Sequence, residues 1–146
     1  MSCPTGHEGL ISKTEYAMKS NLDLIRSTYE GTADQKKRNL LALLSSEIEW
    51  TEAEGFPYGG TYRSADAILT QVFGRLSSEW IDYRSDIERY VADESTVVVF
   101  GWYVGTFKAT QRSMRAAFAH RWTLHEGKVV RFFQYVDSTM VRSAMI

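Results

Sequence analysis

The sequence predicts an α+β fold in which three helices pack on one face of a cone-like, curved antiparallel sheet. Apolar residues recur at helical spacing in the first half of the chain, and four strand-like segments follow one another in the second half. Helices that come early and antiparallel strands that come late are typical of this layout. We expect the element order α-α-β-α-β-β-β-β.

Two capping boxes mark the first two helices, SKTE at residues 12–15 and TADQ at residues 32–35. Gly31 is expected to end the first helix. The apolar stripe of the first helix consists of Met18, Leu22, Ile25 and Tyr29. The buried face of the short second helix is expected to consist of Leu40, Leu41, Leu43 and Leu44.

The segment EIEWTEA, residues 47–53, alternates as a strand, with Ile48, Trp50 and Glu52 on one face. Glycines and a proline in the loop 54–63 predict no regular structure there. Ser64 is expected to cap a third helix. The apolar stripe of that helix consists of Ile68, Leu69, Val72, Phe73 and Leu76.

Four strands joined by short turns are expected to complete the sheet. Their ranges are about 81–91, 96–107, 113–125 and 128–136. Asp137 follows the last strand, where it can cap a short helix. A curved sheet with helices on one face encloses a cone-shaped cavity, and the 13% aromatic content predicts that rings line it.

Composition argues against several classes of protein. A net charge of -1 does not favour nucleic acid or an anionic membrane surface as a partner. No apolar run approaches the roughly 20 residues that span a bilayer, and the first residues lack the features of a signal peptide. The single cysteine, Cys3, excludes an internal disulfide and fits a reducing compartment, so we expect a cytoplasmic protein.

Residues 1–11 lack periodicity and are expected to form a flexible lead before a single domain at 12–146. Cys3 and His7 lie in that lead and are too few to hold a metal. The sequence contains no phosphate loop, nucleophile elbow or His-Glu metal spacing, so neither a metal nor a cofactor is expected.

Several strings resemble the SnoaL-like proteins of the nuclear-transport-factor-2-like (cystatin-like) superfamily, which also holds ketosteroid isomerases and small polyketide cyclases. These strings are STYEGT, EIEWTEAEGFPYGGTYRSADAI, VVVFGWYVGTF and FAHRWTLHEGKVVRFFQYVDS. Together they cover most of residues 14–140. The resemblance implies a curved sheet packed with helices, an internal apolar pocket and a homodimer. The apolar residues on both faces of segment 97–104 also favour a dimer.

Glu52 is the first candidate catalytic residue, because it shares a predicted strand face with Ile48 and Trp50. Burial would raise the pKa of its carboxyl toward values useful in acid–base catalysis. Its position also resembles that of the carboxylate base of the ketosteroid isomerases. The alternative is that the strand has ended, so that Glu52 is solvated or pairs with Arg63.

His120 is the second candidate, since it interrupts an apolar alternation that includes Phe118, Trp122 and Leu124. An imidazole facing a pocket can give or take a proton near neutrality. The alternative is a neutral core histidine held by hydrogen bonds. The resemblance places an aspartate here and often a second histidine near Thr106, so this chain departs from the cyclases and isomerases at both positions.

Aromatic and amide side chains are expected to bind the ligand. They are Tyr29, Trp50, Tyr62, Trp102, Phe118, Trp122, Phe132 and Gln134. Such walls select small hydrophobic or aromatic ligands. The sequence and the resemblance together favour a cofactorless isomerase, dehydratase or cyclase that acts on a small carbonyl compound. The alternative is a non-catalytic ligand-binding or dimeric interaction module of the same fold.

Overall fold

The computed structural model describes residues 19–146. The expected lead at 1–11, the capping box at 12–15 and Met18 therefore lie outside the described residues. Within residues 19–146, no helix is long and apolar enough to cross a membrane.

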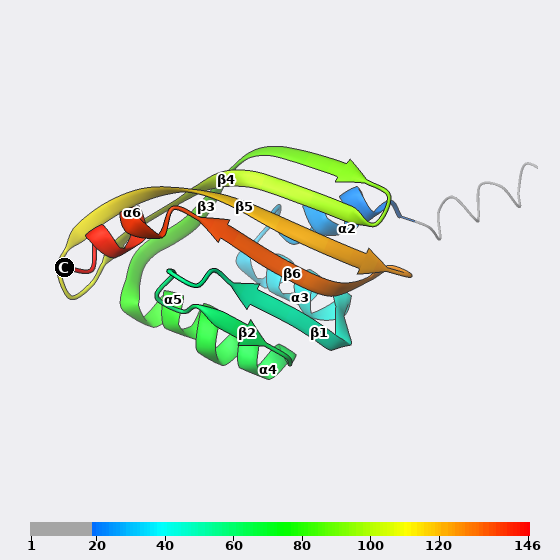
Figure 1. The fold of residues 1–146 in the computed structure, drawn as a ribbon, viewed down its shortest axis with the longest axis horizontal. Helices are drawn as coiled ribbons and strands as arrows, with labels where there is room; N and C mark the ends of the chain where they lie inside the picture. The colour runs from blue at the N-terminus through cyan, green and yellow to red at the C-terminus, as the bar shows by residue number, and fades with distance from the viewer. Residues whose placement is uncertain (1–18) are drawn as a thin grey trace, which may run out of the picture.

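A curved, unclosed six-stranded sheet dominates the molecule (Figure 1), and its strand order is β2-β1-β6-β5-β4-β3. The strands are β1 (Leu44–Glu52), β2 (Gly60–Tyr62), β3 (Trp80–Asp93), β4 (Thr96–Phe107), β5 (Arg112–His125) and β6 (Lys128–Val136). The predicted α+β fold is confirmed, and the four predicted strands of the second half match β3 to β6.

Two features of the sheet differ from the sequence prediction. β1 pairs in parallel with β6, with Trp50 opposite Phe132, so the sheet is mixed rather than antiparallel throughout. Local pattern cannot reveal this pairing, because the two strands are far apart in the sequence. The loop expected to lack regular structure contains β2, whose Tyr62 pairs with Trp50 and extends the sheet by one short strand.

The first described helix, α2 (Asn21–Arg26), is shorter than expected. Turn hydrogen bonds carry the chain from Ser27 to Glu30, so Tyr29 lies in this turn and not on the helix. Gly31 follows with φ 109°, a backbone conformation that favours glycine.

The second described helix, α3 (Ala33–Leu43), opens with the predicted capping box. Thr32 accepts from the backbone of Gln35, whose side chain accepts from the backbone of Thr32 in return. Leu40 and Leu43 are buried as predicted. Leu41 is instead exposed at the surface, and Leu44 already belongs to β1, because the helix ends one residue before it.

The third predicted helix starts at its Ser64 cap but consists of three pieces. They are α4 (Ala65–Ile68), the π-helical turn η1 (Leu69–Phe73) and α5 (Gly74–Glu79). A π-helical turn shifts the face on which later side chains lie. Ile68 and Val72 are buried as predicted, whereas Phe73, at the end of the π-helical turn, is exposed rather than part of the buried stripe.

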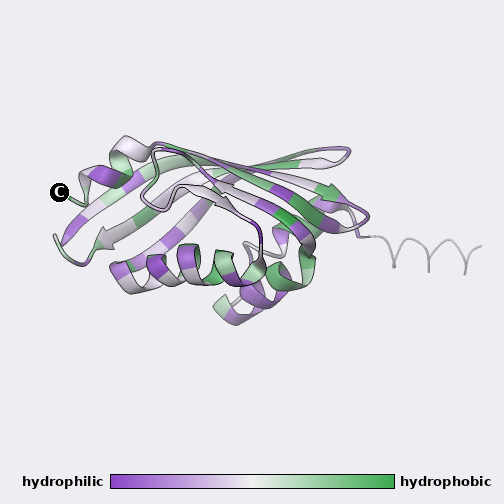
Figure 2. Ribbon diagram, turned by 60° about the horizontal axis from the view of Figure 1, so that its bottom comes forward, coloured by the Kyte–Doolittle hydropathy of each residue, from purple (hydrophilic) through white to green (hydrophobic). Residues whose placement is uncertain are grey.

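The helices α2, α3 and α4 cover the inner face of the sheet, where Ile25, Leu40 and Ile68 contact buried strand residues such as Val99 and Phe132. Hydrophobic and hydrophilic residues alternate along the strands in Figure 2. This alternation gives the sheet one buried face and one face not covered by the described helices.

A short helix, α6 (Ser138–Ser143), follows β6 and lies near the turn between β4 and β5 (Figure 1). Asp137 caps it as predicted, because its carboxylate accepts from the backbone N–H of Met140 at 3.2 Å. Val141 and Ala144 then contribute to a second core cluster with Phe56 and Tyr103.

Candidate active site

Glu52 is buried at the end of β1, with only 4% of its surface exposed. The strand therefore continues through residue 52, as the inward alternation of Ile48 and Trp50 predicted. Trp50 Nε1 donates to Glu52 Oε1 at 2.8 Å, whereas Oε2 has no hydrogen-bond partner among the described residues. Arg63 does not pair with Glu52, because it binds Glu49 at 3.0 Å on the opposite face of the strand.

Burial raises the pKa of the Glu52 carboxyl to about 7, because the charged form loses its hydration. The hydrogen bond from Trp50 opposes this effect only in part. A carboxyl group with a pKa near 7 can both accept and return a proton at neutral pH. The structure thus gives Glu52 the electrostatic setting that its position in the sequence indicated.

His120 lies on the inner face of β5 and binds two tyrosine hydroxyls. Its Nδ1 is 2.6 Å from the Tyr29 hydroxyl, and its Nε2 bonds the Tyr103 hydroxyl. Both ring nitrogens therefore have partners within the protein. Burial lowers the pKa of His120 to about 3, so the imidazole is neutral at neutral pH.

The bonds around the two tyrosines define a continuous chain. Trp122 Nε1 donates to the Tyr29 hydroxyl at 2.9 Å, and Gln134 Nε2 donates to the Tyr103 hydroxyl at 2.8 Å. The backbone N–H of Ala53 donates to Gln134 Oε1 at 3.1 Å, which fixes the orientation of the amide. The chain of hydrogen bonds therefore ends at the peptide N–H that directly follows Glu52 in the backbone.

A neutral imidazole carries one proton, so one tyrosine donates to His120 and the other accepts from it. Each tyrosine hydroxyl already accepts one bond, from Trp122 or from Gln134. The tyrosine that accepts from His120 therefore keeps its own proton for a further acceptor. If Nε2 is protonated, that tyrosine is Tyr103.

Aromatic rings pack around this chain of hydrogen bonds. Trp50 stacks on Phe132 with ring centroids 3.8 Å apart, and Phe118 stacks on His120 at 4.1 Å. Trp122 packs edge-on against Trp50. The structure therefore brings together most of the predicted ligand-binding residues, with Tyr29 and Gln134 among them.

Two of the predicted ligand-binding residues, Trp102 and Tyr62, are not fully buried and do not join the chain of hydrogen bonds. Trp102 lies on the outer face of β4, where the Arg115 guanidinium sits 3.7 Å from its ring centroid, so it does not join the interior group. Strand alternation explains this, because Tyr103 takes the inward position. Tyr62 is half-buried on β2 at the edge of the sheet, where it packs against the core cluster that contains Trp50. Its hydroxyl donates to the carbonyl of Tyr58.

The sequence reasoning missed Tyr103 and Tyr83, which lie on neighbouring strands with ring centroids 5.4 Å apart. The inward parity of Val97 and Val99 could have identified Tyr103. Its partner in the sheet register is Ala116, whose small side chain leaves space for the tyrosine ring. Tyr83 could not be found by parity, because β3 changes register at this point.

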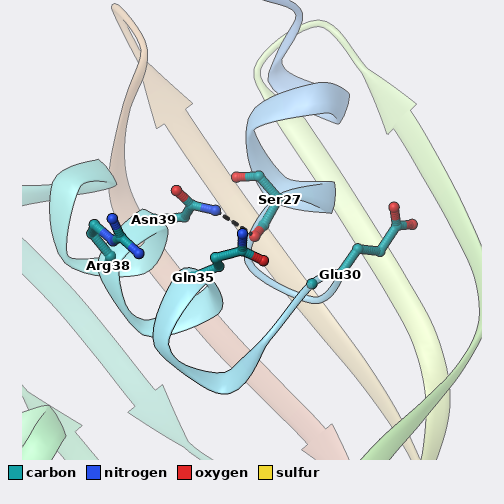
Figure 3. A pocket seen from close by; sticks show the side chains of 6 residues that line it. Ser27, Glu30, Gln35, Arg38 and Asn39 are labelled. Atoms are coloured by element: carbon teal, nitrogen blue, oxygen red, sulfur yellow. Dashed lines mark hydrogen bonds between the residues drawn. The ribbon is translucent and has the colours of Figure 1, made fainter.

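Two hollows open on the surface of the described residues, and neither Glu52 nor His120 lines them. Figure 3 shows one of them, between the end of α2 and helix α3, where Asn39 donates to the carbonyl of Ser27 at 3.0 Å. The second lies around β2 and the start of α4. Within residues 19–146, no three His, Cys, Asp or Glu side chains gather in a way that could hold a metal ion.

Comparison with known families decides the relationship of this chain. The sequence profile of the SnoaL-like domain matches residues 25–132. The chain belongs to the SnoaL-like family. A comparison with curated proteins found no significant match.

Several solved structures share the fold of this chain. An NTF2-like protein from Burkholderia thailandensis E264 is 36% identical, with 88% of this chain and 99% of that chain covered and a TM-score of 0.84. TerC, co-crystallised with polyporic acid, is 22% identical over 86% of this chain and 97% of its own, with a TM-score of 0.73.

A third structure is a protein with a ketosteroid isomerase-like fold from Catenulispora acidiphila DSM 44928 in complex with trimethylamine. It is 12% identical over 86% of this chain and 93% of that chain, with a TM-score of 0.68. At this level of identity, TerC and the Catenulispora protein show similarity of fold alone.

Proposed function

We propose that this SnoaL-like protein is a cofactorless acid–base enzyme that moves a proton on a small, mostly apolar carbonyl compound. The observation that carries the proposal is the Glu52 carboxyl, which is buried, has an unpartnered Oε2 and has a pKa raised to about 7. A structural carboxylate in the core would have partners for both oxygens, since an unpaired buried acceptor costs about 1–3 kcal/mol. A ligand can supply the missing partner.

In this mechanism Glu52 takes a proton from the carbon next to the carbonyl group and returns it elsewhere on the substrate. The carbonyl oxygen becomes an enolate oxygen, which needs hydrogen-bond donors. In this mechanism His120 carries its proton on Nε2, so Tyr103 accepts from the imidazole and donates its own proton to the enolate oxygen. His120 thus serves as a positioning residue for Tyr103, while Tyr29 bonds its Nδ1 and Gln134 donates to the Tyr103 hydroxyl.

Relatives that bind small molecules support a ligand site of this kind. TerC was crystallised with polyporic acid and the Catenulispora protein with trimethylamine. Neither ligand is assigned to this chain. What they support is that small organic molecules bind proteins of this fold. The aromatic rings that pack around Trp50 and His120 favour a flat or cyclic compound here.

A non-catalytic ligand-binding module is the second candidate, and the histidine favours it. Both ring nitrogens of His120 are occupied within the protein, as expected for a residue that stabilises the fold. In that case the Glu52 carboxyl would bind a ligand without exchanging a proton with it.

The test uses 3-cyclohexen-1-one, whose conversion to 2-cyclohexen-1-one is followed by the ultraviolet absorbance of the conjugated product. Glu52 would remove the proton between the carbonyl and the double bond and return it to the far end of the dienolate. We expect turnover by the parent protein and at least a hundredfold loss in Glu52→Gln, a typical contribution of a general base.

Glu49→Gln is the matched control, because Glu49 lies on the same strand but pairs with Arg63 and Arg131 at the surface. It should keep full activity. Equal rates for the parent and Glu52→Gln would contradict the acid–base role. Binding of the ketone without turnover would favour the ligand-binding module.

We also propose that the protein forms a homodimer through the outer face of its sheet. Phe100 and Tyr135 are exposed there, and Arg121 lies over the rings of Phe133 and Tyr135. Large exposed apolar groups on one face are typical of a protein–protein contact.

A further inference from the structure

Tyr83 lies in a β-bulge near the start of β3. Ile81 pairs with Thr106 and Arg84 pairs with Val104, so Asp82 and Tyr83 together oppose the single residue Gly105. A bulge of this kind redirects a side chain, and bulges concentrate next to active sites. Here it points Tyr83 toward the interior, where its ring packs against Tyr103.

The backbone at this bulge is strained. Asp82 has φ 53°, in the left-handed region that non-glycine residues seldom adopt. Such a conformation costs free energy and persists only where the surrounding structure holds it. The strain is local to the residue just before Tyr83.

Gly105 on the neighbouring strand supplies the space that the Tyr83 ring occupies. A Cβ atom at position 105 would lie 3.2 Å from Tyr83 Cδ2 and 3.3 Å from its Cα. The bulge, the strained Asp82 and the missing side chain of Gly105 therefore all serve to place one tyrosine. Packing of the ring alone would not require the hydroxyl group of Tyr83.

The Tyr83 hydroxyl is shielded from solvent and has no hydrogen-bond partner among the described residues. Burial and the nearby Glu52 carboxylate raise the pKa of Tyr83 well above its ordinary value, so the hydroxyl keeps its proton. Glu52 Oε2 is the complementary case, a buried acceptor without a donor. The Tyr83 ring packs against Tyr103, with ring centroids 5.4 Å apart, and burial together with the Glu52 charge raises the pKa of both tyrosines. The free donor and the free acceptor therefore belong to the same part of the interior.

We propose that the Tyr83 hydroxyl and Glu52 Oε2 are the two polar contacts of a ligand site that takes enolisable 1,3-dicarbonyl compounds. The enol form of such a compound is acidic, so one proton shared between its enol oxygen and Glu52 Oε2 would join these two groups, while its second carbonyl oxygen accepts from Tyr83. Tyr103 lies beside Tyr83 and can donate to the same oxygen. This assignment rests on the proposed function, because it requires that Glu52 faces the ligand.

The test measures binding of 2-methyl-1,3-cyclohexanedione by ultraviolet difference titration. We expect the parent protein to bind it and Tyr83→Phe to bind it about tenfold more weakly, which corresponds to the loss of one buried hydrogen bond. Tyr83→Phe should melt at or above the temperature of the parent, since the hydroxyl it removes has no partner. Tyr135→Phe, on the outer face, is the matched control and should bind as the parent does.

Three outcomes would overturn the inference. They are no binding by the parent at millimolar ligand, unchanged affinity in Tyr83→Phe, and a clearly lower melting temperature in Tyr83→Phe. The last would mean that the hydroxyl already bonds Glu52 or another group for the sake of the fold.

The inference and the proposed function can fail separately. If Glu52→Gln loses ketone turnover while Tyr83→Phe binds the dione normally, the acid–base role of Glu52 is supported and the ligand site at Tyr83 is refuted. If Tyr83→Phe loses binding of the dione while the parent protein turns over no ketone, the ligand site at Tyr83 is supported and the catalytic role of Glu52 is refuted.

Discussion

Glu52 and His120 are two buried ionisable residues whose pKa values move in opposite directions. The pKa of Glu52 rises from 4.5 to about 7, and that of His120 falls from 6.5 to about 3. Burial is the leading cause in both cases, since it disfavours the charged form of either group. Between pH 4.5 and 6.5 the two residues therefore have opposite effects on the pH dependence of stability.

The first prediction concerns Glu52→Gln. The folded state keeps the Glu52 proton up to about pH 7, whereas the unfolded chain releases it near 4.5, so this group makes the free energy of unfolding fall as pH rises through that window. The variant should match the parent near pH 4 and exceed its stability by roughly 3 kcal/mol at pH 8. Urea unfolding across this range measures the difference, and a constant difference would mean that Glu52 is solvated.

The second prediction concerns His120→Phe. An aromatic ring fits beside Phe118, but Tyr29 and Tyr103 each lose a hydrogen bond, at a combined cost of about 1–3 kcal/mol at pH 7. Below pH 6.5 the His120 imidazole of the unfolded parent chain binds a proton, whereas that of the folded parent does not. The free energy of unfolding of the parent therefore falls there, and that of the variant does not. The deficit of the variant should therefore shrink toward pH 4.

Chemical unfolding at several pH values tests this second prediction. His125→Phe is the control, because the His125 side chain is 75% exposed and should change stability little. If His120→Phe is as stable as the parent at pH 7, the imidazole contributes nothing to the fold and its role is in the pocket alone.

At the scale of elements, sequence patterns predicted the features that depend on neighbouring residues. The cap at Asp137 and the box at Thr32 use side chains within three residues of their targets, and the structure confirms both. The inward direction of Glu52 and His120 followed from strand alternation. These features are local, so one sequence contains enough information to find them.

Features that depend on distant contacts or irregular backbone were not predicted. The parallel pairing of β1 with β6 needs knowledge of the whole sheet. The bulge at Asp82 shifts the alternation of β3, so the alternation pattern does not identify Tyr83 as an inward-facing residue. Trp102 was placed in the site from its residue type, although alternation puts Tyr103 there instead.

The third prediction belongs to helix α6. Asp137→Ala removes the acceptor for the Met140 N–H and should lower the free energy of unfolding by about 1 kcal/mol. Binding of the dione should not change, because the carboxylate points to the helix end. Thermal melts and the same ultraviolet titration check both statements. Loss of dione binding without loss of stability would mean that Asp137 belongs to the ligand site.

At the scale of the whole molecule, one face of the sheet carries the helices and the other carries exposed rings. The fourth prediction is that light scattering at micromolar concentration finds a homodimer, because a second copy would cover Phe100 and Tyr135. Phe100→Lys should shift the protein toward a monomer. Leu41→Lys is the control, since Leu41 is similarly exposed on helix α3, which covers the inner face. A monomeric parent would contradict the proposed interface.

The parallel pairing of β1 with β6 also has a kinetic consequence. β1 lies early in the chain and its partner β6 lies late, as Figure 1 shows by their colours. Contacts between segments far apart in sequence require closure of a long loop, and this slows folding. Glu52 ends β1 and Gln134 lies on β6, joined through the backbone of Ala53. The candidate site therefore forms only after the early strand β1 has paired with the late strand β6. During synthesis on the ribosome, Glu52 can be enclosed only once β6 has been made.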